Sequence, residues 1–343
     1  MPEKKRGREF ALLNLEIFFM KVFISRKIPE SGLQFLKEAG VEISEWTDKR
    51  DLSSDELIMH CRYADALLSA GGNRIDKNFL DAVRHLKVIS LHSAGFDNVD
   101  VPAATSIRMP IGNTPGVLSE ATADTAFLLM LATSRKAFYM HKTIEQGKWG
   151  FFEPTANLGI DIRRKTLGIY GLGKIGYELA RRASMAFDMK IIYHNRGRHE
   201  EAERKLHAVW VTFDDLLSES DVISVNTSLT AETKGIFDRD AFSAMKPNAI
   251  FVNTARGAIH VEEDLMEALK TGKIWGAGLD VTNPEPMRPD HPLLFMPNVC
   301  ILPHIGSATV ETRAAMSLIA AKNVVAGLRG ERLPFMVNPE IYS

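Results

Sequence analysis

Short apolar runs rich in β-branched residues alternate with longer stretches in which apolar residues recur at helical spacing. The first run, Val22–Ser25, precedes Glu30–Ala39, which has the helical spacing. Such alternation is typical of a parallel sheet covered by helices. It occurs twice, and the expected strands are Val22–Ser25, Val41–Trp46, Ala66–Ser69 and Lys87–His92, then Thr166–Tyr170, Lys190–His194, Asp221–Asn226, Ala249–Asn253, Gly276–Asp280 and Val299–Leu302. The pattern predicts an α/β protein with two Rossmann-like, doubly wound parallel-sheet domains, one flavodoxin-like and one dinucleotide-binding.

The length of 343 residues also favours two domains, because one domain usually holds about 100 to 200 residues. Between the halves, Glu120–Ile144 predicts one or two helices, and Ala308–Leu328 predicts a last helix that returns the chain to the first domain. We therefore expect an N-terminal extension over residues 1–19, a first domain over 20–117 completed by 310–343, and a second domain over 118–309.

Composition narrows the class of protein. Lys and Arg number 42 against 43 Asp and Glu, so no net field favours a nucleic acid or an acidic membrane surface. No uncharged apolar run reaches the roughly 18 residues that a membrane span needs. Cys61 and Cys300 are too few for a disulfide framework or a cysteine-based zinc site, so we expect no metal and a reducing, cytoplasmic location.

Two segments leave alternatives open. The basic start, Met1–Arg8, and the apolar Ala11–Phe19 resemble a targeting peptide, but Asn14 and Glu16 interrupt the apolar part; a loose extension is the other interpretation. The aromatic segment Gly147–Phe152 suits either a homodimer contact or packing within one subunit.

The motif Gly171-Leu172-Gly173-Lys174-Ile175-Gly176 carries the clearest chemistry. It follows the strand Thr166–Tyr170 and opens a helical stretch, which is the context required of a dinucleotide-binding turn. Its glycines permit a tight turn, close approach of a pyrophosphate and close packing of helix on strand. Free amides at the helix start would face the anion. A plain glycine turn is the alternative.

The residues after the next strand indicate which dinucleotide binds. An acidic residue there would bind the adenosine ribose of NAD, and none is present. The chain instead reads Asn195-Arg196-Gly197-Arg198-His199, and two guanidinium groups suit a 2′-phosphate. We expect NADPH as the preferred cofactor, with NADH as the alternative; a solvated basic turn is the other interpretation of the arginines.

Three polar residues follow predicted strands of the second domain: Arg256, Glu285 and His304. Carboxyl ends of parallel strands share one edge of a sheet, so these side chains could converge there. Arginine can bind a carboxylate and polarise the adjacent ketone, and histidine can donate a proton as hydride arrives. A carboxylate beside the imidazole would orient it and favour its protonated form. Taken singly, each residue also suits a surface, capping or ion-pairing role.

Several motifs in order resemble the D-isomer-specific 2-hydroxyacid dehydrogenase family. They are Gly171–Gly176, Asn253–Gly257, Gly278–Val281 with Pro284–Pro286, and Pro303–Thr309. Within that family the chain is most similar to the glyoxylate/hydroxypyruvate reductases, through Val281–Pro286, His291–Leu294, Ile301–Thr309 and Ala326–Glu331. The likeness runs from about Met20 to Pro339, and the residues before Met20 have no counterpart in it.

The resemblance implies roles for individual residues. It implies Arg256, Glu285 and His304 as the catalytic set, and a homodimer through Glu120–Phe152. Substrate contacts are implied for the backbone amides of Ala94 and Gly95 and for Arg256 and Ser307; cofactor contacts are implied for Gly171, Gly173, Lys174, Ile175, Gly176, Asn195, Arg196, Arg198, Ser228, Thr254, Asp280 and Gly306. The chain departs from the family with Ala94 in place of valine and Phe96 in place of a smaller aliphatic residue, which bears on loop shape and substrate size.

The expected reaction is NADPH-dependent reduction of glyoxylate and hydroxypyruvate to glycolate and D-glycerate in a cleft between the domains, with His304 as proton donor. One alternative is an NAD-linked D-3-phosphoglycerate or D-lactate type dehydrogenase. Another, from a different class, is a dinucleotide-sensing corepressor or scaffold that keeps the fold and the same three side chains.

Overall fold

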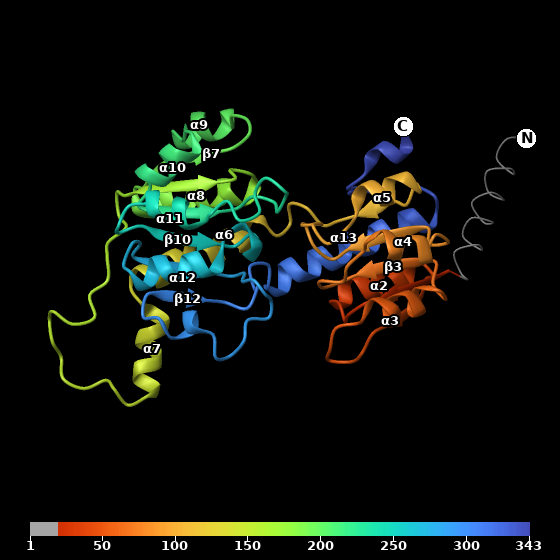
Figure 1. Cartoon of the computed structure of the whole chain (residues 1–343). Helices are drawn as coiled ribbons and strands as arrows, with labels where there is room; N and C mark the ends of the chain where they lie inside the picture. The colour runs from red at the N-terminus through yellow and green to blue at the C-terminus, as the bar shows by residue number, and fades with distance from the viewer. Residues whose placement is uncertain (1–19) are drawn as a thin grey trace, which may run out of the picture. The chain divides into compact units, whose positions relative to one another are not determined.

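The computed structural model describes residues 20–343, which form two compact units (Figure 1). The first unit comprises the described residues up to Leu118 together with Thr309–Ser343, and the second is Ser119–Ala308. Each junction lies one residue from the expected boundary. The expected N-terminal extension, and with it the targeting peptide, lies outside the described residues.

The first unit is built on a five-stranded parallel sheet in the order β2-β1-β3-β4-β5. Its strands are β1 (Lys21–Ile24), β2 (Glu42–Glu45), β3 (Ala66–Ser69), β4 (Val88–Leu91) and β5 (Ile111–Gly112). β3 and β4 are buried along their whole length, because helices cover both faces of the sheet. The pattern of apolar residues predicts four of these strands and misses the two-residue β5.

The helices of the first unit come from both ends of its sequence. They are α2 (Glu30–Glu38), α3 (Ser54–Cys61), α4 (Lys77–Ala82), α5 (Val101–Ser106) and α13 (Val310–Leu328), with a final 3₁₀ turn at Pro339–Tyr342. α13 packs on α2 and β4, so the last helix does return to the first unit. The two helices approach so closely that a Cβ on Gly32 would lie 2.6 Å from the carbonyl oxygen of Ser317.

The second unit is built on a seven-stranded parallel sheet in the order β12-β11-β10-β9-β6-β7-β8. The strands are β6 (Thr166–Tyr170), β7 (Lys190–His194), β8 (Val209–Trp210), β9 (Val222–Val225), β10 (Ile250–Asn253), β11 (Gly276–Leu279) and β12 (Val299–Ile301). All of these except β8 are predicted by the sequence pattern. The order reverses between β6 and β9, which is where such sheets bind ligands.

Helices cover both faces of this second sheet. They are α6 (Ser119–Ser134), α7 (Ala137–Glu145), α8 (Lys174–Phe187), α9 (Glu200–Leu206), α10 (Phe213–Glu219), α11 (Arg239–Ala244) and α12 (Glu262–Lys270), with 3₁₀ turns η1 (Gly257–Ile259) and η2 (Pro292–Phe295). In β10, Phe251 packs on one face, whereas Ile250 and Val252 pack on the other. The two faces therefore have separate apolar cores.

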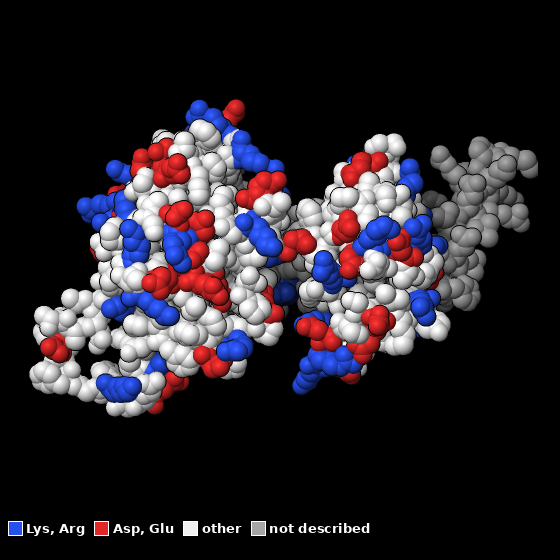
Figure 2. Space-filling model, in the orientation of Figure 1, with Lys and Arg blue, Asp and Glu red and all other residues white. Residues whose placement is uncertain are grey.

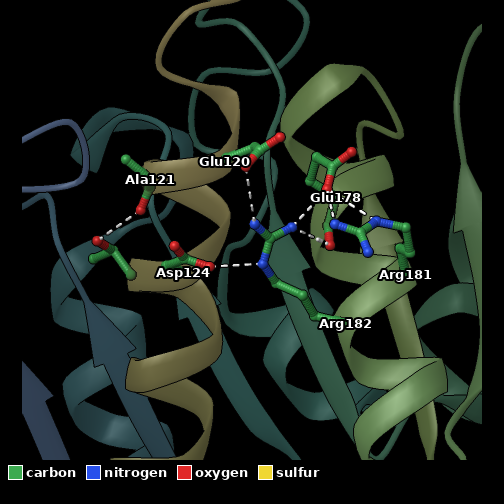
Figure 3. A network of polar contacts seen from close by, with 7 residues as sticks. Glu120, Ala121, Asp124, Glu178, Arg181 and Arg182 are labelled. Atoms are coloured by element: carbon green, nitrogen blue, oxygen red, sulfur yellow. Dashed lines mark hydrogen bonds and ion pairs between the residues drawn. The ribbon is translucent and has the colours of Figure 1, made fainter. Parts of the chain in front are cut away.

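An ion-pair network joins α6 to α8 (Figure 3). The guanidinium of Arg182 on α8 binds Glu178 on its own helix at 2.6 Å and Asp124 on α6 at 2.6 Å, and it lies 3.9 Å from Glu120. Arg181 also donates to Glu178. Since α8 begins directly after the glycine-rich turn, this network fixes the helix that presents that turn.

The segment after α7 does not pack on its own unit. Figure 1 shows it as a long loop standing away from the second sheet, and Trp149, Phe151 and Phe152 are 79%, 96% and 80% exposed. These three side chains therefore do not pack on the second unit, and the homodimer contact stays a prediction. On the face shown in Figure 2, acidic and basic side chains are intermingled over the second unit, in keeping with a net charge of −1. Among the described helices, none is both long and apolar enough to cross a membrane.

Candidate active site

The glycine-rich turn lies at the point where the strand order of the second sheet reverses. Gly171 has φ +96°, and a Cβ there would lie 2.7 Å from the backbone nitrogen of Thr227, which follows β9. A Cβ on Gly173, by contrast, would meet nothing within 4 Å. Because α8 begins at Lys174, its first free amides border this open space. The turn thus has the geometry of a pyrophosphate cradle.

The loop after β7 is tied to that turn. The carboxamide of Asn195 accepts from the backbone N–H of Leu172 at 2.6 Å and donates to the carbonyl of Leu172 at 3.2 Å. Arg198 makes a two-pronged contact with Glu203, at 2.9 and 2.8 Å. Arg196 is exposed. Of the two arginines expected to read a 2′-phosphate, Arg198 thus already has a carboxylate partner.

Asp280 supports the loop that carries His304. Its two carboxylate oxygens accept from the backbone N–H groups of Ile305 and Gly306, each at 2.7 Å, and its own carbonyl accepts from the N–H of His304 at 2.9 Å. Burial raises the pKa of Asp280 above its ordinary value, although these two N–H groups oppose the rise. The family resemblance implies a cofactor contact for Asp280. In the structure Asp280 also holds the backbone of the loop that carries His304.

The three expected catalytic residues follow three neighbouring strands. Arg256 comes after β10, Glu285 after β11 and His304 after β12, and these strands lie side by side at one end of the sheet. Nδ1 of His304 lies 2.9 Å from Oε2 of Glu285. A carboxylate can only accept, so Nδ1 carries the hydrogen and Nε2 is the nitrogen left to face a substrate.

The carboxylate of Glu285 is held from two sides. Its Oε1 accepts from the backbone N–H of Thr282 at 3.0 Å, and its Oε2 binds His304. Burial raises the pKa of Glu285, but His304, the Thr282 N–H and the positive charge of Arg256 together lower it more, so this pKa lies below its ordinary value. Glu285 is therefore ionised beside the imidazole at neutral pH, and Arg256 is close enough to act on it electrostatically.

The turn bearing Arg256 packs directly against the loop bearing Glu285. A Cβ on Gly257 would lie 2.0 Å from the carbonyl oxygen of Thr282, so only glycine fits between the two backbones. The guanidinium of Arg256 donates to the carbonyl of Ala255 at 2.8 Å. The structure thus brings Arg256, Glu285 and His304 together within the second unit.

Other expected site residues lie in several places. Thr254 is buried and its hydroxyl bonds to the side chain of Asn226 at 3.3 Å; Ser228 is exposed and Ser307 is half-buried. Ala94 and Gly95 belong to the first unit, where their carbonyls accept from the side chains of Asn113 and Ser93.

Three residues that support the site were not singled out in the sequence. Asn253 and His260 hold the Arg256 turn through their side chains. Glu262 holds the loop around Glu285, because it accepts from the backbone N–H of Asn283 at 3.2 Å and binds Nε2 of His291 at 3.1 Å. Asn253 lies in the motif Asn253–Gly257, but the motif does not show these contacts, which depend on how the turn and the neighbouring loop fold.

Comparison with known proteins defines the class. Residues 127–306 match the family model described as "D-isomer specific 2-hydroxyacid dehydrogenase, NAD binding domain". The chain therefore belongs to the D-isomer specific 2-hydroxyacid dehydrogenase family, and it is an NAD(P)-dependent oxidoreductase.

Within this family the chain is similar to glyoxylate reductases. It is 42% identical to the glyoxylate reductase of Thermococcus litoralis over 325 residues, which cover 94% of this chain and 97% of that protein. It is 40% identical to the glyoxylate reductase of Korarchaeum cryptofilum over 322 residues, 94% and 96% of the two chains.

Solved structures agree with this assignment. The TT0316 protein from Thermus thermophilus superposes with a TM-score of 0.86 at 40% identity, covering 93% of this chain and 100% of that one. An NADPH-dependent glyoxylate/hydroxypyruvate reductase from Sinorhizobium meliloti, solved with NADP and malonate, superposes with a TM-score of 0.81 at 32% identity, covering 93% and 97%. The expected fold class and family are confirmed.

Proposed function

We propose that this protein reduces glyoxylate, and with it hydroxypyruvate, to glycolate and D-glycerate, using NADPH as hydride donor and His304 as proton donor. The observation that carries the proposal is the His304–Glu285 pair, 2.9 Å from Nδ1 to Oε2, beside the Arg256 turn and at the carboxyl edge of a dinucleotide-binding sheet. The names of the similar reductases support the choice of substrates.

Each side chain has a role in the reaction that follows from its chemistry. Arg256 binds the carboxylate of the 2-oxo acid and polarises the adjacent carbonyl. As hydride reaches the carbonyl carbon, negative charge develops on the oxygen, and the proton on Nε2 of His304 passes to it. Glu285 holds the imidazole by Nδ1 and stabilises its protonated form before the transfer. We propose that the backbone amides of Ala94 and Gly95, together with Ser307, also bind the substrate.

The residues of the second unit fit a nicotinamide dinucleotide. The open space beside Gly173 and the free amides at the start of α8 suit a pyrophosphate. Gly171, Lys174, Ile175, Gly176, Asn195, Ser228, Thr254, Asp280 and Gly306 would complete the site. When bound, the cofactor supplies the hydride.

The arginines after β7 support NADPH over NADH. The chain has no acid at the end of β7 that would bind a free ribose hydroxyl, and Arg196 and Arg198 can bind a phosphate. Because Arg198 is already paired with Glu203, we assign the larger part of the preference to Arg196.

Steady-state kinetics with both substrates and both cofactors test the proposal. We expect kcat/KM with NADPH to exceed that with NADH by at least about tenfold, or about 1.4 kcal/mol. Arg196→Ala should lose more of this preference than Arg198→Ala. His304→Ala should lower kcat by about a hundredfold or more while NADPH still binds, because only the proton donor is removed. An equal preference for the two cofactors refutes the role of the arginines, and unchanged turnover refutes that of His304.

We also propose a homodimer formed through residues 120–152. The exposure of Trp149, Phe151 and Phe152 supports it, since large aromatic side chains seldom face water without a partner surface. A cytoplasmic location is proposed from the two cysteines, Cys61 and Cys300, which are buried and unpaired.

A further inference from the structure

His260 is a buried titratable residue that the proposed chemistry does not use. It follows η1 and is only 2% exposed, with its ring edge-on to Phe251 at 5.7 Å. The backbone on either side is fixed, because Ile259 accepts from the N–H of Phe237 and Val261 donates to the carbonyl of Phe237. The imidazole is therefore held in one place by the core of the second unit.

The ring contacts the carboxamide of Asn253, the last residue of β10. Oδ1 of Asn253 accepts from the backbone N–H of Ala255 at 2.9 Å, and Nδ2 donates to the carbonyl of Arg256 at 2.9 Å. These two contacts determine which end of the amide is oxygen and which is nitrogen. The second hydrogen on Nδ2 points to Nδ1 of His260 at 3.1 Å.

It follows that Nδ1 of His260 accepts a hydrogen bond. The imidazole is then neutral, with its hydrogen on Nε2, because a hydrogen on Nδ1 would oppose the amide N–H. Burial lowers the pKa of His260 to about 4, which agrees with a neutral ring at neutral pH.

The other ring nitrogen makes this arrangement unfavourable for stability. Nε2 is buried and has no hydrogen-bond partner among residues 20–343. A buried N–H without a partner is destabilising, and an apolar side chain of similar size would avoid the penalty. The contribution of a histidine at this position is therefore its Nδ1 acceptor.

We propose that His260 is a positioning residue: by accepting from Asn253 it fixes the amide that shapes the Thr254–Arg256 turn, and so holds the Arg256 guanidinium for the 2-oxo acid. This inference rests on the role assigned to Arg256 in the proposed function. The other side of the turn is already held, since Gly257 lies against the backbone of Thr282. Asn253 and His260 thus supply the support that comes from within the turn.

The experiment compares His260→Leu, which removes the acceptor, with His260→Asn, whose carboxamide can place an oxygen near the position of Nδ1. We expect His260→Leu to lower kcat/KM for glyoxylate by about tenfold or more, because small displacements of a binding group are costly in catalysis. The Kd for NADPH should change much less than kcat/KM, because Thr254 is the one proposed cofactor contact on this turn and the glycine-rich turn is left undisturbed. His260→Asn should recover most of the activity, and His85→Leu, in the first unit, serves as the control for loss of a histidine.

Three results would overturn the inference. The first is a His260→Leu protein that has a lower melting temperature but keeps the wild-type kcat/KM. The second is a His260→Asn protein no more active than His260→Leu. The third is a wild-type ¹⁵N spectrum with the hydrogen of His260 on Nδ1, a measurement that serves even when the variants do not fold. Failure of the proposed function is distinct from these results, since it appears as a wild-type protein that reduces neither glyoxylate nor hydroxypyruvate.

Discussion

Replacing Gly257 with alanine tests the close approach of the turn bearing Arg256 to the loop bearing Glu285. A Cβ at this position would lie 2.0 Å from the carbonyl oxygen and 2.2 Å from the carbonyl carbon of Thr282, and 2.8 Å from the nitrogen of Asn283. All three atoms belong to the backbone, so no side chain can rotate away. A carbon normally stays about 3.3 Å or more from a carbonyl oxygen, so the turns must separate by roughly 1 Å.

The expected loss follows from that separation. Overpacking a buried site is destabilising by about 1 to 3 kcal/mol, and contact between two backbones belongs at the upper end, about 3 kcal/mol. In a unit of this size we expect the melting temperature to fall by roughly 6 to 12 °C. Activity should fall further than stability suggests, with kcat/KM lower by about a hundredfold, because Arg256 moves away from the Glu285 loop.

Differential scanning calorimetry and steady-state kinetics measure the two effects. Gly72→Ala is the matched control, because a Cβ there meets nothing within 4 Å and the position lies in the first unit. It should leave the transition of the second unit unchanged. A Gly257→Ala protein with the melting temperature and the kcat/KM of the wild type would show that the Arg256 turn and the Glu285 loop are not in contact.

Two further predictions concern other surfaces of the second unit. Trp149→Ser combined with Phe151→Ser should convert a dimer to a monomer in sedimentation analysis, because it removes the exposed aromatic surface; a wild-type protein that is monomeric at all concentrations would contradict the proposed interface. Arg182→Ala should lower the free energy of unfolding by about 1 kcal/mol at low salt and by less at high salt, because its partners on α6 are largely exposed. Arg181→Ala, which breaks only the contact with Glu178, should have a smaller effect on denaturant unfolding, and equal effects would argue against the link to α6.

The regular parts of the fold could be predicted because their signals are local. β6 and β7 have the expected bounds, since each is a continuous apolar run that ends in a turn. β5 and β8 could not be predicted, because two residues show no periodicity; Gly112 of β5 is placed partly by a bridge to Met336, far along the chain.

The placement of the three proposed catalytic residues could be predicted for a similar reason, whereas the contacts that support them could not. Arg256, Glu285 and His304 each follow a recognisable strand, and the carboxyl ends of parallel strands share one edge. Nothing in the sequence near Arg198 shows that its guanidinium pairs with Glu203, which lies one turn into α9. Nor does anything near His260 show that its ring meets an amide seven residues earlier. Such contacts depend on three-dimensional packing alone.

The insertion of one unit into the other has a consequence for synthesis on the ribosome. The second unit is complete once Ala308 has emerged, whereas the core of the first unit includes Ala320, Val324 and Leu328 of α13. One of the two apolar cores of the first unit therefore stays incomplete until the last helix emerges, whereas the core on the other face of the sheet comes from residues 23–111. During that interval the uncovered apolar residues of this face are exposed and prone to aggregation.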